Sequence, residues 1–215
     1  MAVSSPHCVL CGGDALNDYS HDRLRRYVRC RRCHLVFVPD EYHLNTEEEK
    51  HRYDQHRNDP HDPRYRAFLS RLMNPLLPKL SPGEHGLDFG SGPGPTLSVM
   101  FEERGFPMQC YDLYYAASPS VLGHRYDFVT CSETIEHFRR PQREWRRFMS
   151  LLRPGGWLGI MTQFLDGIDS FDNWHYKQDP THIGFYSKAT FRWLAAEYGL
   201  DIEFHGHDVV LLHCP

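Results

Sequence analysis

The stretch LDFGSGPGPT, residues 87–96, decides the fold, because an apolar run leads through Asp88 into a loop with glycine at positions 90, 92 and 94. A strand that enters a glycine-rich loop before a helix is typical of nucleotide-binding sheets. Here Pro93 and Pro95 each remove a backbone N–H donor, and no Gly-Lys-Ser/Thr follows. The loop therefore lacks the donors and the lysine of a phosphate-binding P-loop. Pro95 also stands where the dinucleotide fingerprint GxGxxG needs its third glycine.

A carboxylate downstream indicates which ligand the loop suits. Asp112 ends the next apolar run, 18 residues after Gly94. An acidic side chain at the end of that strand can accept both hydroxyls of a ribose. A nucleoside without phosphates is therefore the predicted ligand.

Apolar runs and helical patterns alternate on both sides of this loop. Strands are expected at 84–90, 107–113, 126–133 and 155–164, helices at 96–105, 141–152 and 187–199 with Ser187 as a cap, and two further strands around Gly206 within 201–213. Such alternation predicts an α/β fold, a mostly parallel Rossmann-like sheet with helices on both faces. The last two strands are close enough to form an antiparallel hairpin.

Four of the seven cysteines stand in two CxxC pairs, Cys8 with Cys11 and Cys30 with Cys33, separated by 18 residues. This spacing is typical of a four-thiolate zinc site. Because four thiolates leave no open position, the zinc is expected to be structural. The predicted divisions are a zinc ribbon at 1–40, a helical linker or cap at 41–82, in which Thr46 caps a helix, and the α/β domain at 83–215.

Taken together, LDFGSGPG, YDL, DFVTCSETIEHF and LLRPGGWLGIMTQ resemble the successive motifs of the class I S-adenosylmethionine-dependent methyltransferases. The N-terminal cysteine pairs resemble bacterial members that carry a zinc ribbon. The resemblance implies that Asp88 and the glycine loop face the methionine part of the cofactor and that Asp112 holds its ribose. The full set of implied cofactor residues is Asp88, Gly90, Ser91, Gly92, Gly94, Asp112, Leu113, Ser132 and Glu133.

The chain departs from this family between Asp112 and Tyr126, where only 13 residues intervene. The family usually has a helix, a strand and another helix there, and a single crossover already needs about 10 to 12 residues. The usual third strand is therefore expected to be absent or vestigial, which leaves about six strands.

Two segments offer groups for catalysis. Glu133, Glu136 and His137 follow the fourth strand of the family pattern, although Glu136 is favoured as a structural residue. The long connection after the next strand contains Trp174, His175, Tyr176, His182 and Tyr186. The candidate catalytic residues are His137, His175, Glu133, His182 and Tyr176. The remaining histidines are scattered and form no HExxH or comparable pair, so no catalytic metal is predicted.

The function that follows is methyl transfer from S-adenosylmethionine to a small molecule or biosynthetic intermediate. One alternative is an RNA methyltransferase that uses the arginine-rich segment 21–34, and another is a cofactor-binding scaffold without turnover. The net charge of −4 gives no global attraction to nucleic acid. No signal peptide or membrane span is apparent, so a cytoplasmic, membrane-free protein is expected.

Overall fold

A six-stranded sheet forms the centre of the computed structural model, which describes residues 7–55 and 58–215. Its strand order is β5 (Met108–Tyr111), β4 (Gly86–Phe89), β6 (Tyr126–Ser132), β7 (Leu152–Met161), β10 (Val209–His213) and β9 (Asp201–His205). The first four strands are parallel, and β10 is antiparallel to both β7 and β9. The predicted mostly parallel sheet with a C-terminal hairpin is thus confirmed.

The short segment after β5 leaves this strand at the edge of the sheet. Between β5 and β6 the chain forms only a bridge from Asp112 to Ala116 and the 3-10 turn η3 (Pro119–Gly123). The expected loss of the usual third strand is confirmed.

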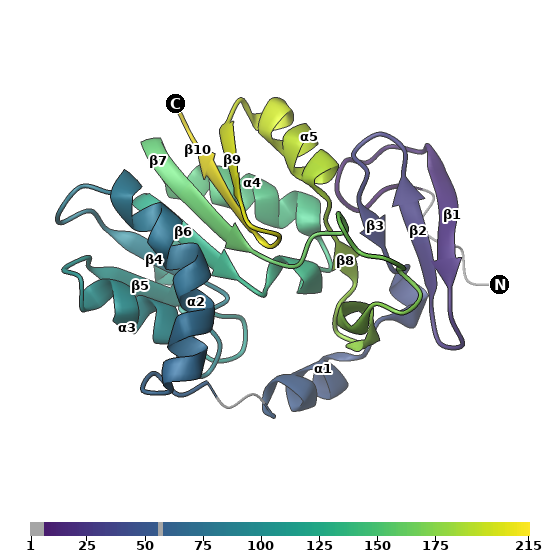
Figure 1. Ribbon diagram of the computed structural model, residues 1–215, viewed down its shortest axis with the longest axis horizontal. Helices are drawn as coiled ribbons and strands as arrows, with labels where there is room; N and C mark the ends of the chain where they lie inside the picture. The colour runs from purple at the N-terminus through teal and green to yellow at the C-terminus, as the bar shows by residue number, and fades with distance from the viewer. Residues whose placement is uncertain (1–6, 56–57) are drawn as a thin grey trace.

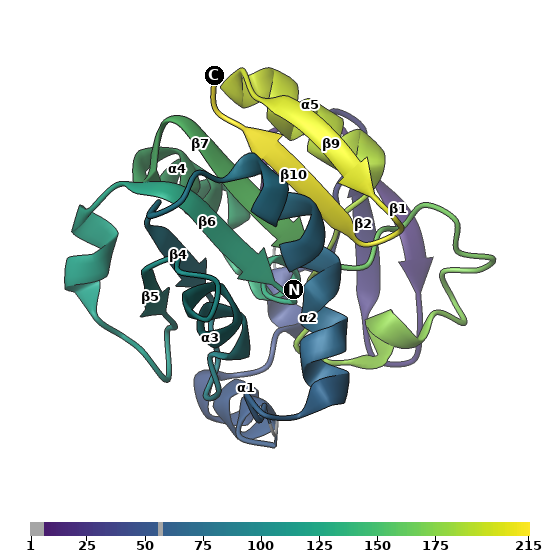
Figure 2. The same ribbon diagram turned by 60° about the vertical axis from the view of Figure 1, so that its left-hand side comes forward.

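Helices cover both faces of the sheet (Figures 1 and 2). On one face lie α2 (Pro63–Leu76) and α3 (Thr96–Glu102), and on the other lie α4 (Pro141–Leu151) and α5 (Lys188–Tyr198). Alternation along β10 shows why both faces are apolar: Val209 and Leu211 pack with α2, whereas Val210 and Leu212 pack with α4 and α5. None of the described helices is long and apolar enough to span a bilayer.

The caps of two helices test local predictions. Ser187 caps α5 as expected, since its hydroxyl accepts the Thr190 N–H. In α1 (Thr46–Tyr53) the expectation was wrong by one residue, because Asn45 is the cap and accepts the N–H groups of Glu47 and Glu48. The Glu48 carboxylate in turn accepts the Asn45 N–H, which completes a capping box between Asn45 and Glu48.

The N-terminal segment forms a second sheet from β1 (Leu16–His21), β2 (Arg26–Cys30) and β3 (Val36–Phe37). Its fourth strand, β8 (Gly184–Phe185), comes from the connection that follows β7. The ribbon therefore lies beside α5 and β8 (Figure 1). Cys30 and Cys33 belong to the same buried cluster as Phe89 of β4 and Trp145 of α4, so the ribbon and the large sheet share one core.

Candidate functional site

The glycine loop after β4 has a backbone that side chains would obstruct. Gly90 and Gly92 have φ of 83° and 65°, the left-handed region that favours glycine. A Cβ on Gly90 would lie 2.3 Å from the Thr134 side chain, and one on Gly94 would lie 1.9 Å from the Asn58 carbonyl oxygen. The loop thus packs closely against Thr134 and Asn58, and the glycines at positions 90 and 94 permit this packing.

Asp112 connects this loop to the segment after β5. Its carboxylate accepts the Gly92 N–H at 2.9 Å and the N–H groups of Tyr114 and Tyr115 at 2.8 and 3.1 Å. Leu113, between these segments, is 65% exposed at the rim of the cavity. The carboxylate therefore holds two cavity-lining loops at the position predicted for the ribose.

Asp88 lies beneath the loop and is 3% exposed. It accepts the Thr130 hydroxyl at 2.8 Å and the Ser98 hydroxyl at 3.3 Å. Burial raises the pKa of this carboxyl to about 6, with a smaller contribution from the charge of Asp112.

The raised pKa of Asp88 predicts how the stability of the apoprotein depends on pH. The folded pKa of about 6 exceeds the ordinary pKa of 3.8 for a free aspartate, so the folded state binds the proton more tightly. The free energy of unfolding should then fall as pH rises through the window between these two values. Asp88→Asn should remove this fall and increase the stability at pH 7.5 by up to about 3 kcal/mol. Urea unfolding across this pH window checks the prediction, and an equal pH slope in both proteins would contradict it.

A cavity of about 660 Å³ extends from the glycine loop to α1. Most of the residues predicted to bind the cofactor line it, namely Asp88, Gly90, Ser91, Gly92, Asp112, Leu113, Ser132 and Glu133. Gly94 instead contributes to the loop's packing against Asn58. Sequence reasoning missed the α1 side of the cavity, where Thr46, Glu49 and Tyr53 line the wall.

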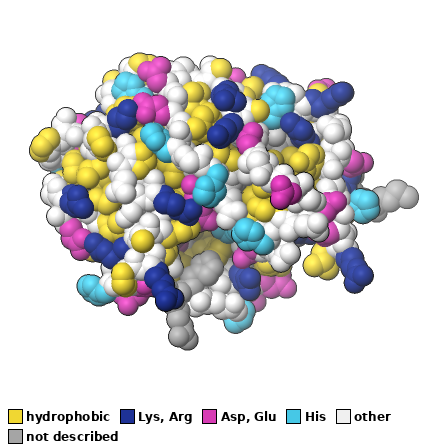
Figure 3. All heavy atoms as spheres, in the orientation of Figure 1, with side chains coloured by type: hydrophobic (Ala, Val, Ile, Leu, Met, Phe, Trp, Pro, Cys, Tyr) yellow, Lys and Arg dark blue, Asp and Glu magenta, His cyan; other side chains and the backbone are white. Residues whose placement is uncertain are grey.

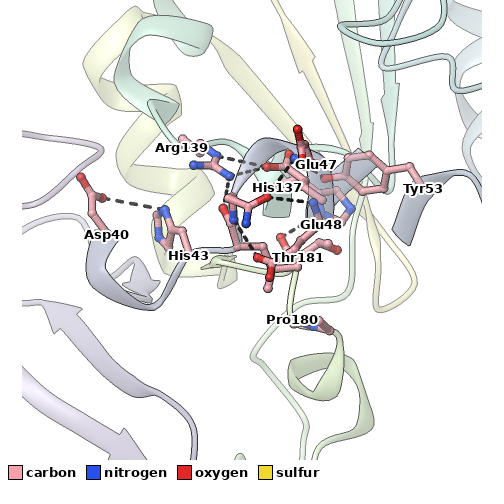
Figure 4. A network of polar contacts seen from close by, with 12 residues as sticks. Asp40, His43, Glu47, Glu48, Tyr53, His137, Arg139, Pro180 and Thr181 are labelled. Atoms are coloured by element: carbon pink, nitrogen blue, oxygen red, sulfur yellow. Dashed lines mark hydrogen bonds and ion pairs between the residues drawn. The ribbon is translucent and has the colours of Figure 1, made fainter. Parts of the chain in front are cut away.

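Of the candidate catalytic residues, Glu133, His137 and His182 line the cavity. His137 belongs to the 3-10 turn η4 (Ile135–His137), and its Nδ1–H donates to the Thr181 carbonyl at 3.0 Å. Figure 4 shows His137 and Thr181 within one polar network, with Tyr53 of α1 beside them. The His137 and His182 rings are 4.8 Å apart between centroids. The structure therefore brings together two histidines that are 45 positions apart in the sequence.

His182 and Glu133 both lie in a desolvated part of this wall. Burial lowers the pKa of His182 to about 4, so its imidazole is neutral near pH 7. Burial and the charge of Glu136 raise the pKa of Glu133 well above its ordinary value. Glu133 also has a φ of 46°, a left-handed conformation that is uncommon for a residue with a side chain.

Tyr176 and His175 lie outside the cavity wall. Tyr176, in the 3-10 turn η5 (His175–Gln178), is buried and donates its hydroxyl to the Glu136 carboxylate. His175 is exposed and contacts Gln163 through its Nε2 at 3.4 Å. Tyr176 thus supports the wall from behind, whereas His175 faces solvent.

The four cysteines of the ribbon converge at one point. The Sγ atoms of Cys8 and Cys33 are 3.5 Å apart, as are those of Cys11 and Cys30, and all four lie within 4.8 Å of one another. Sulfurs that bind a tetrahedral zinc at about 2.3 Å are about 3.8 Å apart. The sulfur separations are too long for disulfides and suit a four-thiolate zinc site.

Arg25 of the ribbon supports the segment that carries His182. It is 8% exposed, and its guanidinium donates to the carbonyls of Asp179, Pro180 and His182 at 3.0 to 3.3 Å and to that of Lys177. One buried cation therefore binds four backbone acceptors of the segment that includes Asp179 and His182 of the cavity wall.

Removing this guanidinium should loosen the wall. Arg25→Ala removes a donor that four carbonyls share, although the Asp179 carbonyl keeps the His182 N–H, and we expect the free energy of unfolding to fall by about 2 to 4 kcal/mol. Arg26→Ala is the matched control, because Arg26 pairs with Asp18 at the surface. This substitution should lower the free energy of unfolding by less than about 1 kcal/mol. Urea unfolding of both variants distinguishes the two cases, and similar losses would refute the role of Arg25.

Comparison with known proteins identifies the family to which the chain is similar. Residues 61–204 match the family described as "Methyltransferase domain". The ubiquinone biosynthesis O-methyltransferase of Aeromonas salmonicida is 32% identical over 77 residues, which are 36% of this chain and 32% of that protein. The chain thus matches about a third of the length of this curated relative.

Two solved structures share the fold. An S-adenosylmethionine-dependent methyltransferase from Archaeoglobus fulgidus is 16% identical with a TM-score of 0.55, over 69% of this chain and 93% of that one. Phosphoethanolamine N-methyltransferase 2 of Haemonchus contortus, in complex with S-adenosylmethionine, is 18% identical with a TM-score of 0.50, over 64% of this chain and 37% of that one.

Proposed function

Because this chain belongs to the methyltransferase-domain family, we propose that it transfers a methyl group from S-adenosylmethionine to a small molecule bound under α1. The observation that carries this proposal is the cavity of about 660 Å³ that joins the glycine loop to α1. Pockets of about 300 to 1,000 Å³ are typical of cofactor and small-molecule sites.

The cofactor end of the cavity fits a nucleoside with a sulfonium. The left-handed Gly90 and Gly92 let the backbone approach a bulky ligand, and Asp112 presents a carboxylate at the rim. The two prolines of the loop withhold N–H donors that a phosphate would need. Bound S-adenosylmethionine supplies an electrophilic methyl group, and the residues of this chain position both reactants.

The acceptor end is enclosed by polar and aromatic side chains. Glu49 of α1 accepts the Arg139 guanidinium Nε–H at 3.1 Å and the Tyr53 hydroxyl at 3.2 Å. These contacts hold α1 against η4 and place Tyr53 next to His137, with ring centroids 5.3 Å apart. An acceptor under α1 would lie beside these side chains, which could orient it toward the methyl group.

The charge distribution supports a small acceptor over RNA. Arg25 of the arginine-rich segment is buried against backbone carbonyls, and Arg26 pairs with Asp18. Figure 3 shows basic and acidic side chains interspersed over the face in view. Nucleic-acid binding usually relies on a continuous basic surface.

A radiolabel experiment tests the proposal. The protein is incubated with S-adenosylmethionine labelled in its methyl group, together with either the low-molecular-mass fraction of a cell extract or purified total RNA. We expect label in the low-molecular-mass products, and no label in RNA. Label in RNA would instead support the RNA methyltransferase. No transfer despite S-adenosylhomocysteine binding would favour the scaffold.

A further inference from the structure

We propose that Glu136, His137 and His182 form a binding site for a divalent transition-metal ion at the acceptor end of the cavity. One potential ligand atom from each of the three side chains lies within 4.8 Å of the others. Ligands about 2.1 Å from a common ion are about 3 to 4 Å apart, so a small contraction completes the geometry. The four-thiolate cluster of the ribbon is a separate group.

The backbone fixes the three residues relative to one another. Glu136 and His137 are adjacent in η4, and His182 directly precedes Ile183, whose N–H donates to the Glu136 carbonyl at 2.8 Å. One backbone hydrogen bond thus aligns the two segments that supply the ligands.

Hydrogen bonds set both imidazoles in the tautomer that binds metals. His137 Nδ1 contacts the Thr181 carbonyl at 3.0 Å, and His182 Nδ1 contacts the Tyr176 carbonyl at 2.6 Å. Because carbonyl oxygens only accept, each Nδ1 carries the proton and each Nε2 keeps a lone pair. A backbone acceptor for the second ring nitrogen is the usual support of a metal-binding histidine.

Glu136 supplies the charge. Its side chain is fully buried, and its carboxylate accepts the hydroxyls of Thr162, at 3.1 Å, and Tyr176. Within residues 7–55 and 58–215, neither lysine nor arginine forms an ion pair with it. A buried carboxylate without a cationic partner is costly, and a bound cation would offset that cost.

The ligand set indicates which ions suit the site. Two imidazole nitrogens and one carboxylate oxygen favour Mn²⁺, Fe²⁺, Co²⁺ or Zn²⁺ over Mg²⁺ and Ca²⁺, which prefer oxygen ligands. Three protein ligands leave coordination positions open, and His137 and His182 both line the cavity. If the proposed methyl transfer is correct, these positions point to an acceptor that carries a hydroxyl or carboxylate oxygen.

Electron paramagnetic resonance with Mn²⁺ tests the site without measuring activity. The protein is first loaded with one equivalent of zinc per chain, which the four thiolates take up in preference to the nitrogen and oxygen ligands, and is then titrated with Mn²⁺, whose free signal disappears on binding. We expect one bound Mn²⁺ per chain. His137→Gln and His182→Gln should each weaken binding about 10-fold to 100-fold. His175→Gln is the matched control, because His175 is exposed outside the cavity. The affinity of this variant for Mn²⁺ should equal that of the unaltered protein.

Several outcomes would overturn the metal site. These are the absence of Mn²⁺ binding, equal affinity in His182→Gln with circular dichroism unchanged, or equal loss in the His175 control. Electron spin-echo modulation of the unaltered protein should also show coupling to imidazole nitrogens, and its absence would refute the site even if both variants misfold. Calorimetry with S-adenosylhomocysteine distinguishes failure of the metal site from failure of the proposed function. Binding of S-adenosylhomocysteine without binding of Mn²⁺ overturns only the metal site. Binding of Mn²⁺ without binding of S-adenosylhomocysteine overturns only the proposed methyl transfer.

Discussion

Replacing Cys33 with serine is expected to disrupt the fold of the whole chain and to cause the largest loss of stability among our predictions. Cys33 is fully buried, and its Sγ lies 3.5 Å from that of Cys8. Structural zinc sites contribute about 10 to 16 kcal/mol in small zinc-finger peptides. Even partial loss of this contribution, by about 5 kcal/mol, is comparable with the entire stability of many domains.

The effect should reach the large sheet because the two sheets are not independent. Cys33 and Leu35 share a buried cluster with Phe89 of β4 and Phe148 of α4. The ribbon sheet also takes β8 from the connection that carries His182. Loss of zinc should therefore disorder the acceptor end of the cavity as well as the ribbon.

Zinc content and thermal unfolding test this expectation. The Cys33→Ser protein should bind less than one zinc per chain and unfold at a much lower temperature, and chelation of the unaltered protein should have the same effect. Cys214→Ser is the control, because Cys214 lies outside the thiolate cluster. A Cys33→Ser protein with full zinc content and an unchanged unfolding temperature would refute the structural role of the metal.

Asp112→Ala is expected to cause the largest loss of cofactor affinity, measured as S-adenosylhomocysteine binding by calorimetry. Charge-assisted hydrogen bonds in which a carboxylate accepts ribose hydroxyls contribute about 1.5 to 3 kcal/mol to the binding free energy. The same carboxylate accepts three backbone N–H groups, from Gly92, Tyr114 and Tyr115, so its removal also releases the loops around the ligand. We therefore expect the affinity to fall about 100-fold, close to the upper limit of 3 kcal/mol.

Two further variants make this test specific. Asp112→Asn keeps one acceptor oxygen and should show an intermediate loss. Asp201→Ala changes an exposed aspartate of β9, away from the cavity, and should leave the affinity unchanged. Unchanged binding in Asp112→Ala would exclude the ribose assignment.

Local patterns were sufficient to predict most elements of the large sheet. Each apolar run or helical pattern lies within a short contiguous segment, as in β6 and α4, so it can be recognised from the sequence. The strands are apolar because helices cover both faces of the parallel sheet. The missing strand could be predicted as well, because 13 residues cannot form two helices and a strand. Even the one-residue error at the α1 cap came from a local choice between Asn45 and Thr46.

The sequence by itself determined the glycine-rich loop, the cysteine pairs and the alternation of strands and helices, because each depends on neighbouring residues whose spacing restricts the backbone. Only the tertiary structure decided that Arg25 supports the cavity wall, that α1 lines the cavity and that His182 meets Glu136 and His137. These contacts join segments between 45 and 157 residues apart. Their formation depends on how the two sheets pack on one core, which no local pattern specifies.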